Sequence, residues 1–182
     1  MNKILIVAAL FMSIQSVAIS GTAKNDHRDT LKCNFLKSEN LDLTGDGKLE
    51  RLSASVYGKN CAVAKFTVTI ETNEKKRMYS FSEQFKYMYV AHRYNKEEVD
   101  HEARRLLNMV FSYNRKVMPE INKLVHKSEL QGIQEFYSVT KDKYLKLKSQ
   151  NLPYISHPVH YEGGLFVTFD KQKNKIVKFG GY

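Results

Sequence analysis

The nonapeptide DLTGDGKLE, residues 42–50, places oxygen atoms at a regular spacing. Its odd-numbered positions can each supply one oxygen ligand, from the side chains of Asp42, Thr44, Asp46 and Glu50 and from the backbone carbonyl of Lys48. Calcium binds oxygen ligands of this kind, and Gly47 permits the sharp turn that would wrap them around an ion. The spacing predicts a structural calcium loop, and a glycine-rich hairpin without metal is the alternative.

This loop resembles the D-x-D-x-D-G-x-x-D calcium loop that joins two strands in integrin-type and related bacterial extracellular repeats. It differs by Thr44 at the third position and Glu50 at the ninth. It is not an EF-hand, because Ser53 occupies the twelfth position, where that motif has a bidentate Glu. The family has such loops in series, whereas this chain has one copy. The resemblance therefore implies a calcium-stabilised hairpin and not the repeat fold.

Catalytic motifs are absent from the sequence. It contains no G-x-S-x-G, no H-E-x-x-H and no phosphate-binding glycine loop. His157, His160 and Glu162 lie close together, but no further His or Cys nearby completes a metal-ligand set. The sequence therefore favours a protein that is not an enzyme. The alternative is an exported hydrolase with scattered catalytic residues, including a histidine near His157 or His160.

Residues 1–23 have the pattern of a secretory signal peptide. Lys3 is their only charge, residues 4–12 are apolar, and small residues allow cleavage after position 18, 20 or 23. The apolar run is shorter than the roughly 20 residues that cross a bilayer. We therefore expect a periplasmic or secreted protein that is not an integral membrane protein, with residues 24–182 as a single globular domain.

Two cysteines and an excess of basic residues characterise the expected mature chain. Cys33 and Cys61 are the only cysteines, and in an oxidising compartment an isolated pair is expected to form a disulfide. Removal of Lys3 leaves 28 basic against 19 acidic residues, a formal charge of 28 − 19 = +9. This charge favours an acidic protein or an anionic envelope component as partner. Nucleic acid is not favoured, because no nucleic-acid-binding module is recognisable.

The hydropathy pattern predicts an α+β domain. Alternation of apolar and polar residues predicts antiparallel strands at residues 50–58, 64–71, 77–81, 165–169 and 176–179. Asn95 and Glu98 resemble a capping box before a helix, whose apolar stripe comprises Val99, Ala103, Leu106, Leu107, Val110 and Phe111. Two more helices are expected, one from Pro119 and one at about 133–148, while residues 85–92 fit either a strand or a helix. We expect an antiparallel sheet with two or three helices packed on one face.

These features together favour a binding function. Export, a single domain, a basic surface and eleven tyrosines are typical of proteins that bind other macromolecules. The function predicted from the sequence is an exported bacterial envelope binding protein, such as an inhibitor or immunity-type protein directed at an extracytoplasmic enzyme or toxin. The residues that would bind the partner are not predicted.

Overall fold

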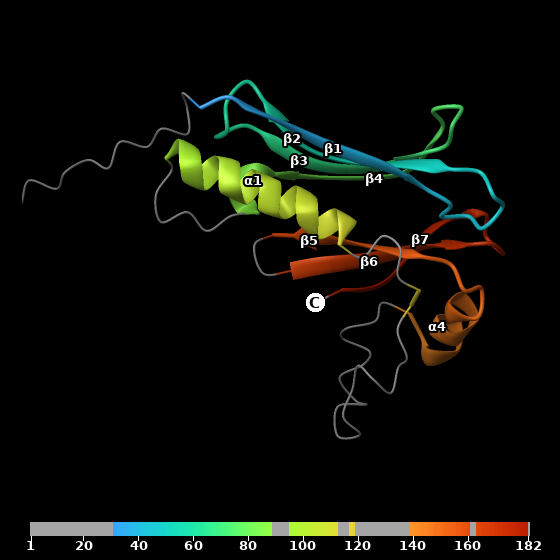
Figure 1. Ribbon diagram of the computed structural model, residues 1–182. Coiled ribbons are helices and arrows are strands. Elements are labelled where there is room, and N and C mark those ends of the chain that lie inside the picture. Colours follow the sequence, from blue (N-terminus) through green and yellow to red (C-terminus); the bar gives the residue numbers. More distant parts are fainter. Residues whose placement is uncertain (1–30, 89–94, 113–116, 119–138, 161–162, 182) are drawn as a thin grey trace, which may run out of the picture.

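The computed structural model describes residues 31–88, 95–112, 117–118, 139–160 and 163–181 (Figure 1). These residues form two antiparallel sheets and two α-helices, which confirms the α+β class. The expected signal peptide and the helix expected from Pro119 lie outside them. No described helix is long and apolar enough to cross a membrane.

The first sheet contains four strands in the order in which they occur in the chain. They are β1 (Cys33–Leu41), β2 (Glu50–Gly58), β3 (Lys65–Glu71) and β4 (Arg77–Gln84). In β2 and β3 every second residue is buried, namely Leu52, Ala54, Val56, Phe66, Val68 and Ile70. Side chains of a strand point alternately to the two faces of a sheet. The sheet therefore has one core face and one face turned to solvent, as the alternation predicted.

The helix α1 (Lys96–Phe111) lies along the core face of this sheet (Figure 1). Asn95 is its N-cap and accepts a hydrogen bond of 2.9 Å from the N–H of Glu98. The Asn95 side-chain amide in turn donates to the Glu98 carboxylate at 3.3 Å. This capping confirms the predicted start of the helix. Its buried residues are the six of the predicted stripe.

The second sheet contains β5 (Tyr154–Val159), β6 (Gly163–Asp170) and β7 (Lys175–Gly181), in that order. It lies beside α1 on the same side of the first sheet (Figure 1). The helix α4 (Lys141–Lys148) contacts β6. Thr140 is the N-cap of α4, since its side chain accepts a hydrogen bond from the N–H of Lys143.

The second sheet has a hydrophobic core on each face. Ile155, Val167 and Phe169 belong to the larger core, together with α1 and the buried residues of the first sheet. On the opposite face, a smaller core includes residues from α4, β5 and β7, namely Tyr144, Leu147, Tyr154, Val177 and Phe179. Because β5 is covered on both faces, five of its six residues are buried.

The arrangement of the elements differs from the single sheet expected from the sequence. Two separate sheets form. α1 packs against both of them, and α4 packs on the other face of the second sheet. β5 was not predicted, because a strand buried on both faces shows no alternation and because Pro158 argues against a strand. Within residues 85–92, the described part contains the short 3₁₀ helix η2 (Phe85–Tyr87). Of the helix expected at 133–148, the described part is helical from Lys141.

A disulfide joins Cys33, the first residue of β1, to Cys61, which follows β2. Both cysteines are buried, and the N–H of Cys61 donates a hydrogen bond to the Leu31 carbonyl at 2.9 Å. The predicted pairing is therefore confirmed. The bond fixes one end of the β1–β2 hairpin, opposite the loop of residues 42–50.

Candidate functional site

The loop of residues 42–50 joins β1 to β2. The Asp42 carboxylate accepts hydrogen bonds from the N–H groups of Gly45 at 2.6 Å and Gly47 at 3.0 Å. Both glycines have positive φ angles, +70° and +81°, which other residues adopt only at a cost. A Cβ at Gly45 would also lie 2.6 Å from Cδ2 of Leu152. The two glycines thus allow the tight turn that the sequence indicated.

The other two loop carboxylates are also held by hydrogen bonds. The Thr44 hydroxyl lies 2.9 Å from Oδ1 of Asp46 and 3.3 Å from Oε1 of Glu50. The buried Glu50 carboxylate accepts the N–H of Leu43 at 2.7 Å, and Asp46 accepts the N–H of Lys48 at 2.9 Å. The hydrogen bonds from Lys48 and Thr44 lower the pKa of Asp46. Asp46 is therefore ionised at neutral pH.

The predicted calcium ligands are brought together only in part. Thr44, Asp46 and Glu50 meet at the Thr44 hydroxyl, whereas Asp42 is turned to backbone N–H groups on the other side. Within the described ranges, no three Asp, Glu, His or Cys side chains form a group that could hold a metal. The loop's own donors engage its carboxylates, so calcium stays a prediction from the sequence pattern.

A cleft of about 440 Å³ opens beside this loop. Three connections border it: the loop of residues 42–50, the β3–β4 turn at 72–76 and the β6–β7 turn at 171–174. Met78 of β4 and Phe169 of β6 supply apolar contacts inside it. The cleft therefore lies where connections from both sheets meet. The β1–β2, β3–β4 and β6–β7 connections are at one end of the molecule (Figure 1).

Each side of the cleft contributes a lysine. Lys48 comes from the β1–β2 loop, Lys76 from the β3–β4 turn, and Lys175 from the start of β7. All three are exposed. In the part of the chain that the structure describes, neither Lys76 nor Lys175 forms a salt bridge. Three lysines thus border one cleft from distant points in the sequence.

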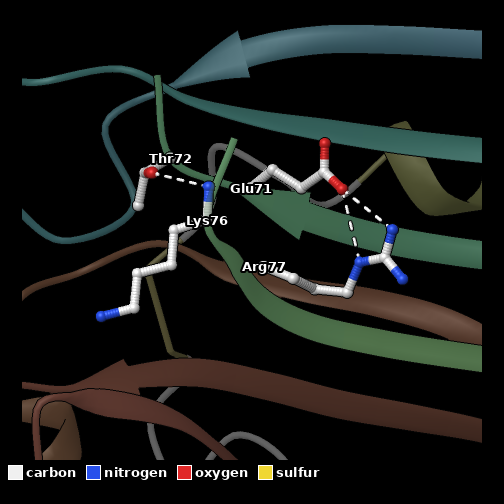
Figure 2. Close-up of polar contacts among 4 residues, drawn as sticks. All are labelled: Glu71, Thr72, Lys76 and Arg77. Atoms are coloured by element: carbon white, nitrogen blue, oxygen red, sulfur yellow. Dashed lines mark hydrogen bonds and ion pairs between the residues drawn. The ribbon is translucent and has the colours of Figure 1, made fainter. Parts of the chain in front are cut away.

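Acidic residues also line the cleft, namely Asp46, Glu50 and Glu74, together with a further basic residue, Arg77. Arg77 forms a salt bridge of 3.1 Å with Glu71 (Figure 2). In the same turn the Lys76 N–H donates to the Thr72 hydroxyl at 3.2 Å, and the Lys76 side chain extends away from the Glu71–Arg77 pair (Figure 2). Asp46 and Glu50 line the cleft, but loop donors hold their carboxylates. Glu74 is an exposed acidic residue at the rim.

His157 is not part of this cleft, because it is buried between the two sheets. Its Nδ1 lies 3.1 Å from the Pro158 carbonyl, and its Nε2 lies 2.7 Å from the Tyr79 hydroxyl. A carbonyl can only accept, so Nδ1 carries the proton and Nε2 accepts from the Tyr79 O–H. The Phe81 ring also contacts the imidazole, at 4.5 Å between centroids.

Burial shifts the pKa of both members of this pair. It lowers the pKa of His157 to about 4, and the hydrogen bond with the Pro158 carbonyl opposes the shift. It also raises the pKa of Tyr79 to about 12. At neutral pH both groups are therefore uncharged, which suits a hydrogen bond that joins two sheets through an apolar interior.

The other histidine named in the sequence, His160, is separate from His157. It is exposed, and its Nδ1 lies 3.9 Å from the Glu83 carboxylate. Glu162 lies outside the described residues. The structure therefore does not bring His157 and His160 to one site.

Sequence reasoning identified the loop of residues 42–50 but not the cleft beside it. Both turns that complete the cleft were visible as polar, lysine-bearing segments, 72–76 and 171–174. Nothing local showed that they lie next to the loop, because the strands that carry them belong to different sheets. Comparison of the chain with protein-family models, with curated proteins and with solved structures found no match.

Proposed function

We propose that this protein is an exported binding protein that holds an acidic protein in the cleft beside the loop of residues 42–50. The observation that carries the proposal is that Lys48, Lys76 and Lys175 reach one cleft from three separate connections. The partner would be an extracytoplasmic enzyme or toxin, and this protein its inhibitor or immunity protein. Periplasm or external medium is the proposed location, because the signal pattern and the disulfide both suit an oxidising compartment.

The charges at the cleft support an acidic partner. Lys76 and Lys175 are cations whose charge no described carboxylate neutralises within salt-bridge distance. The expected mature chain as a whole has a formal charge of 28 − 19 = +9. A positive surface accelerates encounter with an acidic partner, and close charge pairs then contribute to affinity and specificity. Met78 and Phe169 offer the apolar contact that a partner's side chain could bury.

An exported hydrolase remains the alternative function. It would need a histidine and a carboxylate at a site that substrate can reach. His157 is buried and donates its Nδ1 proton to a backbone carbonyl, so it does not favour this reading. A hydrolase would have to use His160 and the neighbouring Glu83 instead. Both side chains are more exposed than that of His157.

The test is capture of the partner from an envelope extract of the producing cells. The bait is the purified protein with its disulfide intact, compared with a variant carrying Lys48→Glu, Lys76→Glu and Lys175→Glu. We expect the native protein to retain one acidic protein at low salt, and the variant to lose it. Raising the salt to about 0.5 M should release it, because screening over a few ångströms weakens contacts between exposed charges.

A second variant with the same change in charge controls for net charge. It carries Lys59→Glu, Lys141→Glu and Lys178→Glu, which are exposed residues that do not line the cleft. This variant should retain the partner as the native protein does. Equal loss from both variants, or no retained protein at low salt, would refute binding at the cleft.

We also propose calcium as a structural ion of the loop of residues 42–50. Its support is the oxygen spacing and the ionised Asp46, whose carboxylate shares the Thr44 hydroxyl with that of Glu50. The ion would stiffen the β1–β2 side of the cleft. In this proposal the partner binds without calcium, because the cleft lysines hold it.

A further inference from the structure

The solvent face of the first sheet carries two rows of hydroxyl side chains. Strand pairing aligns one residue from each of the four strands in each row. One row consists of Ser38, Ser53, Thr69 and Ser80, and the next consists of Leu36, Ser55, Thr67 and Ser82. Seven of these eight positions are Ser or Thr, and we call the eight residues the hydroxyl rows.

These side chains are open to solvent. α1 and the second sheet pack on the opposite face, where the intervening residues of β2 and β3 are buried. Ser38, Ser80 and Ser82 on the two edge strands are exposed. Thr67 and Ser82 lie 3.3 Å apart, oxygen to oxygen, within hydrogen-bonding distance across neighbouring strands. The hydroxyls are therefore held in fixed positions by the sheet.

An apolar patch adjoins the hydroxyls. The side chains of Leu36 and Tyr57 are 65% and 67% exposed, although both are large and apolar. They lie on the same face of neighbouring strands, because Leu36 pairs with Ser55, two residues before Tyr57. Such diagonal neighbours are within reach of each other. Tyr57 stands in a third row with Asn34, Lys65 and Gln84.

Charge is missing from the hydroxyl rows. The chain is 26% charged, yet none of the eight positions holds Asp, Glu, Lys or Arg. An acidic partner would be met by cations at these positions. A second copy docked through this face would bury few apolar groups, since Leu36 is the one apolar member of the rows. Charged residues of this face flank the rows: Lys65 pairs with Tyr57, and Nη2 of Arg51 lies 3.3 Å from the Ser38 hydroxyl. The rows between them suit a ligand that is neutral and combines hydroxyl groups with apolar surface.

A sugar ring has this combination. Its hydroxyls donate and accept hydrogen bonds, as those of Ser and Thr do, and its C–H face can pack on an exposed aromatic ring such as Tyr57. Asn34 and Gln84 add amide groups, which also donate and accept. We infer that the solvent face of the β1–β4 sheet binds a neutral polysaccharide, whose hydroxyls contact the hydroxyl rows while one ring packs on Tyr57 and Leu36.

The test measures retention of the purified protein on swollen cellulose and on chitin, two insoluble neutral polysaccharides. We expect retention on at least one of them that about 0.5 M NaCl does not reverse, because the polysaccharide is neutral and the hydroxyl rows hold no charged residue. Tyr57→Ala should lower the affinity about tenfold through loss of the ring contact. Ser82→Glu, at an exposed edge position, should lower it at least as much by placing a charge in the rows.

Two controls separate this surface from the rest of the molecule. Tyr87→Ala removes a tyrosine that is 50% exposed and outside the rows, and it should leave retention unchanged. The triple Lys→Glu variant of the cleft should also be retained, which makes this inference independent of the proposed function. Unchanged circular dichroism and melting of each variant establishes that its fold is intact.

Three results would overturn the inference. The first is no retention on either polysaccharide. The second is retention that salt abolishes, or that Tyr57→Ala and Ser82→Glu leave as it was. The third is self-association in sedimentation that Tyr57→Ala removes, because the face would then belong to a second copy of the chain.

Discussion

Tyr79 and His157 form the clearest polar connection between the two sheets. Their side chains approach to 2.7 Å although the residues are 78 positions apart in the chain. The Pro158 carbonyl fixes the tautomer, so the ring offers an acceptor to the Tyr79 hydroxyl. A buried acceptor that loses its donor is costly. At the scale of single residues, this hydrogen bond should therefore matter to stability more than surface contacts do.

Tyr79→Phe should reduce the free energy of unfolding by about 1–3 kcal/mol, because Nε2 of His157 would remain buried without a donor. Urea denaturation followed by circular dichroism measures the change. Tyr87→Phe is the matched control, since the hydroxyl of this exposed residue should matter by less than about 0.5 kcal/mol. Equal stability of the Tyr79→Phe and native proteins would contradict a structural role for the pair.

His157 should make the fold sensitive to acid. Its pKa falls from 6.5 in the unfolded chain to about 4 in the folded protein. Between these values the unfolded state binds more protons, so stability falls as the pH drops. Above pH 6.5 the imidazole is neutral in both the folded and the unfolded state. Its full contribution to the free energy of unfolding is then present.

The expected loss from this residue is about 1.4 kcal/mol per pH unit within that window, about 3 kcal/mol in total. Urea midpoints of the native protein and of His157→Gln between pH 7 and 4 measure it. Other groups titrate in both proteins, so the difference in slope isolates the imidazole. Parallel pH profiles of the two proteins would show that the histidine does not stay neutral in the fold.

The β1–β2 hairpin connects the disulfide, the loop of residues 42–50 and part of the hydroxyl rows. The disulfide fixes one end, and the loop of residues 42–50 forms the other. Between them, Leu36, Ser38, Ser53 and Ser55 belong to the hydroxyl rows. β2 is also a central strand, paired with β3 along its length. Changes at either end of the hairpin should therefore affect the stability of the whole sheet.

Reduction of the Cys33–Cys61 bond should lower the free energy of unfolding by about 3 kcal/mol, because it releases a loop closed over 28 positions. Urea denaturation with and without reductant gives the value. Mass spectrometry after alkylation should find both thiols protected in the native exported protein. Two thiols that react freely in that protein would contradict the bond.

Calcium should raise the melting temperature if the loop binds it as the sequence pattern predicts. Since the ion would bind only the folded loop, the shift grows with the logarithm of its concentration above the dissociation constant. That constant is expected at about 0.1 to 1 mM, as in extracellular modules. Melting is compared in millimolar calcium and in chelator, for the native chain and for Asp46→Ala. Identical curves for the native chain would leave the loop as a metal-free turn.

β2 and α1 were predictable from the sequence, whereas β5, which is covered on both faces, was not. β2 matches the alternating segment 50–58, and α1 matches its cap and apolar stripe. β5 carries five buried residues, two of them polar, and its polar groups are paired by contacts distant in sequence, such as Tyr79 with His157. The cleft was not predicted either, because the three connections that border it come from different sheets.

At the scale of the whole molecule, the first sheet separates two surfaces of different chemistry. The middle of its outer face is rich in hydroxyls and carries no charged residue in the hydroxyl rows. The cleft lies at the end of the molecule, where lysines from three connections meet. A protein organised in this way can hold an acidic partner at its end while the face of its sheet rests on a polysaccharide. The two activities use no common residue, so each can be removed without the other.

The central claim is that the three cleft lysines, and not the overall charge, hold an acidic protein. The most direct measurement is the dissociation constant of the captured partner, by calorimetry, for the native protein and the two triple Lys→Glu variants. Reversal at Lys48, Lys76 and Lys175 should weaken binding at least tenfold, or about 1.4 kcal/mol. Reversal at Lys59, Lys141 and Lys178 should change it by less than about threefold, because distant exposed charges are screened. Equal weakening by the two variants would contradict the claim.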